Sequence, residues 1–193
     1  MQTLGRWLFK YRSFVPIPVA LALVFVRWRA TSSAWVLTAG PLLVALGQGL
    51  RIWAVRHIGT ISRTRSTRLG PLVTGGPYAL IRNPLYVGNL FLWTGFAVWS
   101  GLLWMIPLVW LIFVIEYTAI ERWEAASLQG QFSAAYEEYI RTVPKWIPRW
   151  SRIGEALRSR GPHPWREVFF SERGTLLAAA LMSALMVWRH LGD

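Results

Sequence analysis

The chain has 193 residues, 54% of them hydrophobic, and a formal net charge of +12 at pH 7. So large an apolar share in so short a chain suits either one compact domain or a small membrane bundle. The sequence contains no cysteine, which excludes disulfides, a thiolate nucleophile and a cysteine zinc site. Its three histidines lack the H-E-x-x-H spacing, so we expect no metal centre.

Five apolar stretches are long enough, or nearly long enough, to cross a hydrocarbon core that needs ~20 helical residues. In chain order they are residues 14–28, 35–55, 86–99, 102–120 and 175–191. Ser100 and Gly101 leave almost no loop between the third and fourth, which predicts an antiparallel helical hairpin. No small-residue cleavage site follows the first stretch, so we expect an uncleaved span there rather than a signal peptide. The predicted fold class is all-α integral membrane, with about five transmembrane helices.

The basic residues gather in alternate loops of this predicted bundle. They precede the first span, lie between the second and third, and follow the fourth, while the opposite side receives mainly Arg27, Arg29 and Arg189. The positive-inside rule then predicts that the N-terminus, the loop between the second and third spans and the tail after the fourth lie in the cytoplasm. We expect a multi-pass protein of the bacterial inner membrane, with the site facing the cytoplasm. A basic face of this kind also suits anionic membrane lipids as partners. No nucleic-acid recognition motif accompanies the charge, so we do not expect nucleic acid as a partner, and the oligomeric state is left open.

Irregular backbone is expected just before the third span, in "GGPYALIRNPLYVGN", residues 75–89. The triplet Gly75, Gly76 and Pro77 is a strong turn signal. Pro84 disfavours helix at Asn83. Irregular backbone at a membrane surface has amide groups free to hold something polar.

A long amphipathic helix is expected after the fourth span. Leu128, Phe132, Tyr136 and Tyr139 recur at helical spacing with polar residues between them. The pattern predicts that the fourth span continues out of the membrane as a helix and ends at Pro144. The two tyrosines serve mainly to dock this helix, with a role in the site as the alternative.

These features together resemble a known family. "LVTGGPYALIRNPLYVGN", the tight hairpin, Glu124 ahead of the amphipathic stripe, and "VPKWIP" look like the integral-membrane S-adenosylmethionine methyltransferases, the isoprenylcysteine carboxyl methyltransferase and phospholipid methyltransferase group. The resemblance covers about residues 46–148 as a methyltransferase core. Residues 1–45 form an N-terminal membrane helix and the start of the second span, and residues 149–193 a basic interfacial segment and a final membrane helix that is an anchor or closes the bundle.

The resemblance implies a cofactor site without a Rossmann fold, between the turn, the hairpin and the following helix. S-adenosylmethionine enters from the cytoplasm, and a lipid or lipidated small-molecule acceptor arrives from the bilayer. The residues implied for the cofactor are Gly76, Pro77, Tyr78, Arg82, Asn83, Pro84, Tyr86, Gly88, Gly95 and Glu124. Close helix packing remains an alternative role for Gly88 and Gly95. A place in the interfacial aromatic belt remains an alternative for Tyr78 and Tyr86.

Two departures from the family pattern affect the expected chemistry. The family's R-H-P-x-Y element has Asn83 in place of histidine, as in the N-P-M-Y of phosphatidylethanolamine methyltransferases, which favours a phospholipid amine as the acceptor. Of the family's paired glutamates only Glu124 remains, because the second position is Ala125. Whether the site is complete is therefore an open question.

Arg51, Glu124 and Tyr86 are the candidate catalytic residues. Arg51 stands in the family's L-R-x-W-A pattern, and an arginine within a membrane segment is costly enough that a function is the default, although it could also snorkel to the surface. We expect it to pair with Glu124 or to orient the acceptor, while Glu124 binds the cofactor's ammonium or accepts a proton from an amine. The alternatives are a carboxyl O-methyltransferase of the isoprenylcysteine type, a nicotinamide-dependent reductase of similar fold, and a catalytically silent membrane protein.

Overall fold

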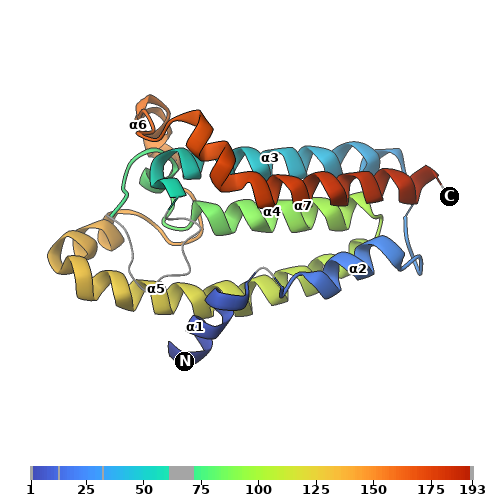
Figure 1. Ribbon diagram of the computed structural model, residues 1–193, viewed down its shortest axis with the longest axis horizontal. Coiled ribbons are helices and arrows are strands. Elements are labelled where there is room, and N and C mark those ends of the chain that lie inside the picture. Colours follow the sequence, from blue (N-terminus) through green and yellow to red (C-terminus); the bar gives the residue numbers. More distant parts are fainter. Residues whose placement is uncertain (1, 13, 32, 61–71, 192–193) are drawn as a thin grey trace.

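The computed structural model describes residues 2–12, 14–31, 33–60 and 72–191 (Figure 1). Within these ranges the chain forms helices and short 3₁₀ turns, in the order α1 (Gln2–Tyr11), α2 (Ile17–Phe25), α3 (Ala34–Ile58), η2 (Gly76–Ala79), α4 (Pro84–Trp99), η3 (Leu103–Met105), α5 (Ile106–Thr142), η4 (Trp150–Arg152), α6 (Ile153–Arg158) and α7 (Trp165–Leu191). The all-α membrane fold predicted from the sequence is confirmed.

Three helical segments among the described residues are long and apolar enough to cross a membrane: residues 34–58, 103–130 and 165–191. Helix α4 has 16 residues and α2 has 9, so they are about 24 Å and 13 Å long. Both are shorter than a hydrocarbon core of ~30 Å. The first predicted span, residues 14–28, therefore contains only the short helix α2, and α1 is a separate helix before it. Pro16 and Pro18 explain the break, because proline is accepted in the first turn of a helix and disfavoured further inside.

The bundle has two layers, with α3, α4 and α7 in one and α2 and α5 in the other (Figure 1). Apolar side chains fill the space between them, and Leu23, Leu102 and Met186 are fully buried there. The outer faces are also apolar, as the exposed Leu111 and Leu177 illustrate. Such faces fit a lipid environment, where the surrounding solvent is itself apolar.

Helices α3 and α4 pack closely because glycines line their contact. A Cβ built at Gly47 would lie 2.6 Å from the Gly88 carbonyl oxygen, and one at Gly95 would lie 2.8 Å from the Val44 nitrogen. Small residues that let two backbones approach are the usual basis of such packing in membranes. Gly88 and Gly95, which the resemblance assigned to the cofactor, thus face α3 in this structure.

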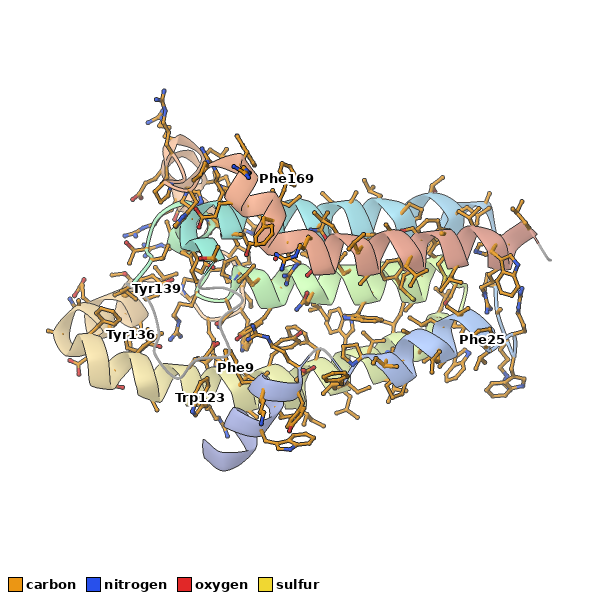
Figure 2. The ribbon with its side chains drawn as sticks, viewed as in Figure 1. Phe9, Phe25, Trp123, Tyr136, Tyr139 and Phe169 are labelled. Atoms are coloured by element: carbon orange, nitrogen blue, oxygen red, sulfur yellow. The ribbon has the colours of Figure 1, made fainter. Side chains whose placement is uncertain are left out.

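Helix α5 is continuous over 37 residues, or about 55 Å. The predicted continuation of the fourth span is confirmed, and the helix ends at Thr142, with extended backbone at Val143 just before Pro144. Tyr136 and Tyr139 are buried near this end (Figure 2).

Helix α7 begins at Trp165, ten residues before the predicted start of the last span at Thr175. The segment predicted to lie on the surface therefore supplies the first turns of this helix, with Val168, Ser171 and Glu172 buried. At the other end of α7 the Arg189 guanidinium donates to the Val24 carbonyl oxygen at 2.8 Å. Helix α7 thus closes the bundle and is more than an anchor.

Candidate active site

The turn before α4 packs against the end of α3. Gly76 has φ +59°, a conformation that side chains rarely adopt, and a Cβ there would lie 2.3 Å from the His57 ring. Pro77 is fully buried. Gly76, which the resemblance assigned to the cofactor, therefore packs on His57, and Pro77, assigned likewise, is buried next to it in η2.

The segment before α4 is bonded to the segment after α5. The Arg82 amide donates to the Pro144 carbonyl oxygen at 3.0 Å, and the Asn83 side-chain amide donates to the Lys145 carbonyl oxygen at 3.2 Å. The Tyr139 hydroxyl donates to the Tyr78 carbonyl oxygen at 2.9 Å. The N-P-x-Y step and the end of α5 are thereby joined as one unit, with Pro84 at the first position of α4.

A chain of hydrogen bonds and one ring contact crosses the bundle between α5 and α3. The Tyr86 hydroxyl donates to Glu124 Oε2 at 2.8 Å. The Tyr86 ring lies against the Tyr117 ring, with 4.5 Å between centroids. The Asn89 side-chain amide donates to the Tyr117 hydroxyl at 2.8 Å, and its oxygen accepts from Arg51 Nη1 at 2.8 Å. The three predicted catalytic residues therefore belong to one network.

Arg51 pairs with Glu172 of α7. Its Nε and Nη2 donate to the two carboxylate oxygens at 2.9 and 2.8 Å, and the side chains are 11% and 1% exposed. Nη2 also donates to Thr175 Oγ1 at 3.3 Å. A Cβ at Gly88 would lie 2.6 Å from Arg51 Cγ, so this glycine makes room for the arginine. The predicted pairing of Arg51 with Glu124 is wrong, because α7 presents a carboxylate to α3 while Glu124 is bonded to Tyr86 on the other side of the bundle.

Three members of this network, Asn89, Tyr117 and Glu172, were missed in the sequence. Asn89 and Tyr117 lie within apolar stretches of the sequence, and a polar side chain in such a stretch is itself a signal of a buried polar contact. For Glu172 the signal was spacing, since Val168, Ser171, Glu172 and Thr175 recur at the intervals of one helical face.

Tyr78 has a buried hydroxyl with no hydrogen-bond partner among the described residues. Burial raises the pKa of Tyr78 well above its ordinary value, and the charges of Glu124 and Arg51 also act on it. At neutral pH the group is therefore a protonated hydroxyl that faces the charged network. A buried polar atom without a partner is uncommon enough to point to a missing ligand or water.

Helix α1 covers the site from a direction outside the family resemblance. Leu8 and Phe9 pack against Tyr117 and Trp123, with the Phe9 and Trp123 rings 4.8 Å apart (Figure 2). The charge of Arg12, which follows α1, acts on Glu124. The N-terminal segment thus helps to enclose the site and adds a positive charge beside it.

The site carries donors and acceptors suited to a zwitterionic ligand. Glu124 offers a carboxylate, Arg82 has a buried Nε without a partner among the described residues, and Tyr78 offers a hydroxyl. These groups suit a ligand that carries a positive charge, a negative charge and hydroxyls. A cluster of three histidine, cysteine, aspartate or glutamate side chains that could hold a metal does not occur in the described ranges.

Comparison with known proteins gives a family match over residues 35–135, to a family described as phospholipid methyltransferase. The chain is 36% identical over 126 residues to the cobalt-zinc-cadmium resistance protein CzcN of Cupriavidus metallidurans. It is 33% identical over 134 residues to the nickel-cobalt-cadmium resistance protein NccN of Alcaligenes xylosoxydans xylosoxydans. These alignments cover 65% and 69% of this chain but 55% and 60% of the relatives, so the chain spans less than two thirds of their length. No solved structure matches the chain.

Proposed function

The chain belongs to the phospholipid methyltransferase family, and we propose that it transfers a methyl group from S-adenosylmethionine to a lipid-like acceptor, most favourably a phospholipid amine of the phosphatidylethanolamine type. The observation that carries this proposal is the Tyr86–Glu124 hydrogen bond, which is joined through Tyr117 and Asn89 to Arg51. All five residues lie inside the matched region and give a polar site to an otherwise apolar bundle.

The residues present fit the cofactor's chemistry. S-adenosylmethionine, when bound, supplies a methyl group already activated by a positively charged sulfur, so the protein needs to align the reactants more than to create a nucleophile. Alignment alone can be worth ~7 to 11 kcal/mol. Glu124 provides negative charge for the cofactor's cationic groups, and Arg82 suits its carboxylate. The buried Tyr78 hydroxyl has no hydrogen-bond partner among the described residues and suits a cofactor hydroxyl.

Glu124 also serves the acceptor. An amine attacks only when it is unprotonated, and transfer into a poorly solvated site lowers its pKa. Glu124 then accepts the proton that the nitrogen releases, directly or through water. Tyr86, as the donor to Glu124 Oε2, holds the carboxylate in one orientation for that step.

The contacts of Arg51 favour an amine over a carboxylate acceptor. All three of its side-chain nitrogens already donate, to Glu172, Asn89 and Thr175. An arginine so engaged is a positioning residue for Asn89 and Tyr117, and it has little capacity left to orient an anionic substrate. The runner-up, an isoprenylcysteine-type carboxyl O-methyltransferase, would have to rely on Arg82 for that task.

We further propose that the protein lies in the bacterial inner membrane with this site towards the cytoplasm, because its basic loops share one side. The relatives named for metal resistance do not alter the proposed chemistry. Those names describe those proteins and are not carried over to this chain.

The test is transfer of a tritiated methyl group from S-adenosylmethionine, with isolated membranes that contain the protein. Phosphatidylethanolamine and farnesylcysteine are supplied separately, and the chloroform-soluble radioactivity is counted. We expect phosphatidylethanolamine to be labelled, with losses of about 100-fold in Glu124→Gln and about tenfold in Tyr86→Phe. Glu155→Gln, an exposed change on α6, is the matched control and should retain activity. A folded wild type that labels neither acceptor would support the silent alternative.

A further inference from the structure

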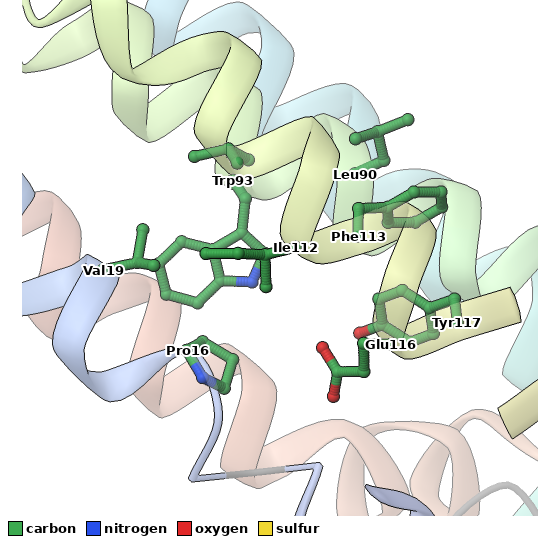
Figure 3. Close-up of a pocket in the computed structure, with 9 residues that line it drawn as sticks. Pro16, Val19, Leu90, Trp93, Ile112, Phe113, Glu116 and Tyr117 are labelled. Atoms are coloured by element: carbon green, nitrogen blue, oxygen red, sulfur yellow. The ribbon is translucent and has the colours of Figure 1, made fainter. Parts of the chain in front are cut away.

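A small pocket lies between α2, α4 and α5, next to the polar network (Figure 3). Its volume is about 30 Å³. The residues that line it are Pro16, Val19, Leu90, Trp93, Val109, Ile112, Phe113, Glu116 and Tyr117. Glu116 is the one acidic side chain in an otherwise apolar and aromatic lining.

Glu116 is 4% exposed, and its Oε1 has no hydrogen-bond partner among the described residues. Figure 3 shows its carboxyl group pointing into the pocket. A carboxylate buried without a partner is costly, so such a group is normally completed by a cation or a hydrogen-bond donor. Arg12 is near enough for its charge to act on Glu116. The pocket wall nonetheless leaves Oε1 available to a ligand.

The aromatic residues of the lining specify the kind of cation. Trp93, Phe113 and Tyr117 border the same space as the carboxylate. The faces of aromatic rings attract cations, and rings gathered around a pocket are the recognised way to bind methylated ammonium groups. The apolar walls suit methyl groups, which need no hydrogen bonds. An anionic ligand would meet both the Glu116 charge and the negative ring faces.

Size and position connect the pocket with the acceptor. A volume of 30 Å³ corresponds to about two or three water molecules, which accommodates part of an ammonium head group and leaves a lipid chain outside. Glu116 precedes Glu124 by two helical turns on α5, or about 12 Å. Tyr117 belongs to both places, because it lines the pocket and also contacts Tyr86 and Asn89.

We propose that this pocket binds the methylated ammonium end of an amphiphile, with Glu116 as the counter-ion and Trp93 and Phe113 as the aromatic wall. The inference rests on the proposed function, since it assigns the pocket to an amine acceptor before it reaches Glu124, or to the methylated product after transfer. It adds a subsite in the apolar part of the bundle, outside the residues that the family resemblance assigned.

The test is calorimetric titration of the protein in dodecyl maltoside with hexyltrimethylammonium. Its uncharged analogue, with carbon in place of nitrogen, serves as the matched probe. We expect the cation to bind the wild type at least about tenfold more tightly than the analogue, and Glu116→Gln to remove that preference. Trp93→Leu should weaken the cation several-fold, and Glu155→Gln should bind as the wild type does. Thermal unfolding establishes that each variant is folded.

Equal binding of the cation and the analogue by the wild type would overturn the inference without any variant, and so would wild-type affinity in a folded Glu116→Gln. Titration with S-adenosylhomocysteine in the same detergent separates the two proposals. A wild type that binds S-adenosylhomocysteine without preferring the cation overturns the subsite alone. A wild type that binds the cation but not S-adenosylhomocysteine overturns the proposed function and, with it, the assignment of the pocket to an acceptor.

Discussion

Replacement of Glu172 by alanine should destabilise the bundle more than any exposed charge change on the same helix. The carboxylate is 1% exposed and accepts two hydrogen bonds from Arg51, at 2.9 and 2.8 Å. Glu172→Ala leaves the guanidinium buried without its counter-charge. Breaking a buried pair in this way costs about 3 to 5 kcal/mol, which for a chain of this size lowers the unfolding midpoint by roughly 6 to 20 °C.

The assay is thermal unfolding in detergent, followed by circular dichroism. Glu167→Ala is the matched control, because Glu167 is on the same helix but only partly buried, with Oε1 3.1 Å from His163 Nδ1. A surface pair of that kind is worth at most about 1 kcal/mol. The double variant Arg51→Met/Glu172→Met removes both charges and should recover much of the loss, since apolar replacement of a whole buried pair is often neutral.

Two results would show that the Arg51–Glu172 pair does not stabilise the bundle in this way. One is a Glu172→Ala midpoint no lower than that of Glu167→Ala. The other is a double variant as unstable as the single one, which would mean that packing around α7, rather than the unpaired Arg51 charge, sets the cost.

Three further predictions follow from the fold. Gly95→Leu should lower the unfolding midpoint by forcing α3 and α4 apart. Gly49→Leu is the control and should leave the midpoint unchanged, because no atom lies within 4 Å of a Cβ built at Gly49. Equal midpoints for the two variants would contradict the close packing of α3 on α4 at Gly95. Burial raises the pKa of Tyr139 in the folded protein, so the contribution of this tyrosine to folding stability is complete below about pH 10, where the unfolded chain begins to ionise, and falls above it. The unfolding midpoint of Tyr139→Phe should therefore decline less steeply than that of the wild type between about pH 9 and pH 11. Equal declines in the two proteins would contradict this prediction. Because the chain has no cysteine, a single cysteine introduced as Gly154→Cys or as Ala30→Cys can be labelled specifically in intact cells. A membrane-impermeant maleimide should label the Ala30→Cys protein and not the Gly154→Cys protein, because the proposed orientation puts residue 154 on the cytoplasmic side. The reverse pattern would mean that the orientation is inverted.

The parts of the structure that the sequence predicted well depend on local patterns. The stripe of Leu128, Phe132 and Tyr136 defines one helical face, and α5 continues through it to Thr142. Gly101, at φ +74°, forms the tight connection expected after α4. Such features are set by residues a few positions apart, so they can be read without knowledge of the rest of the fold.

The parts that were missed depend on contacts between distant segments. Glu172 stands among charged residues and looked like part of a surface segment, and only the approach of α7 to α3 makes it the partner of Arg51. The face of Gly88 could suit a ligand or a neighbouring helix, and α3 occupies it. The role of Phe9 in covering the site likewise arises from packing against Trp123 on α5. Spacing in the sequence indicates which face of a helix is special, but not what lies against it.

The most direct measurement of the central claim is calorimetric titration of the detergent-purified wild type and Glu124→Gln with S-adenosylhomocysteine. We expect micromolar binding by the wild type and a loss of about tenfold or more in the variant, because the amide removes a charged partner worth ~1.5 to 3 kcal/mol. Both proteins must show the same circular dichroism spectrum. A folded wild type that releases no heat of binding, or a Glu124→Gln variant that binds as tightly as the wild type, would contradict the account.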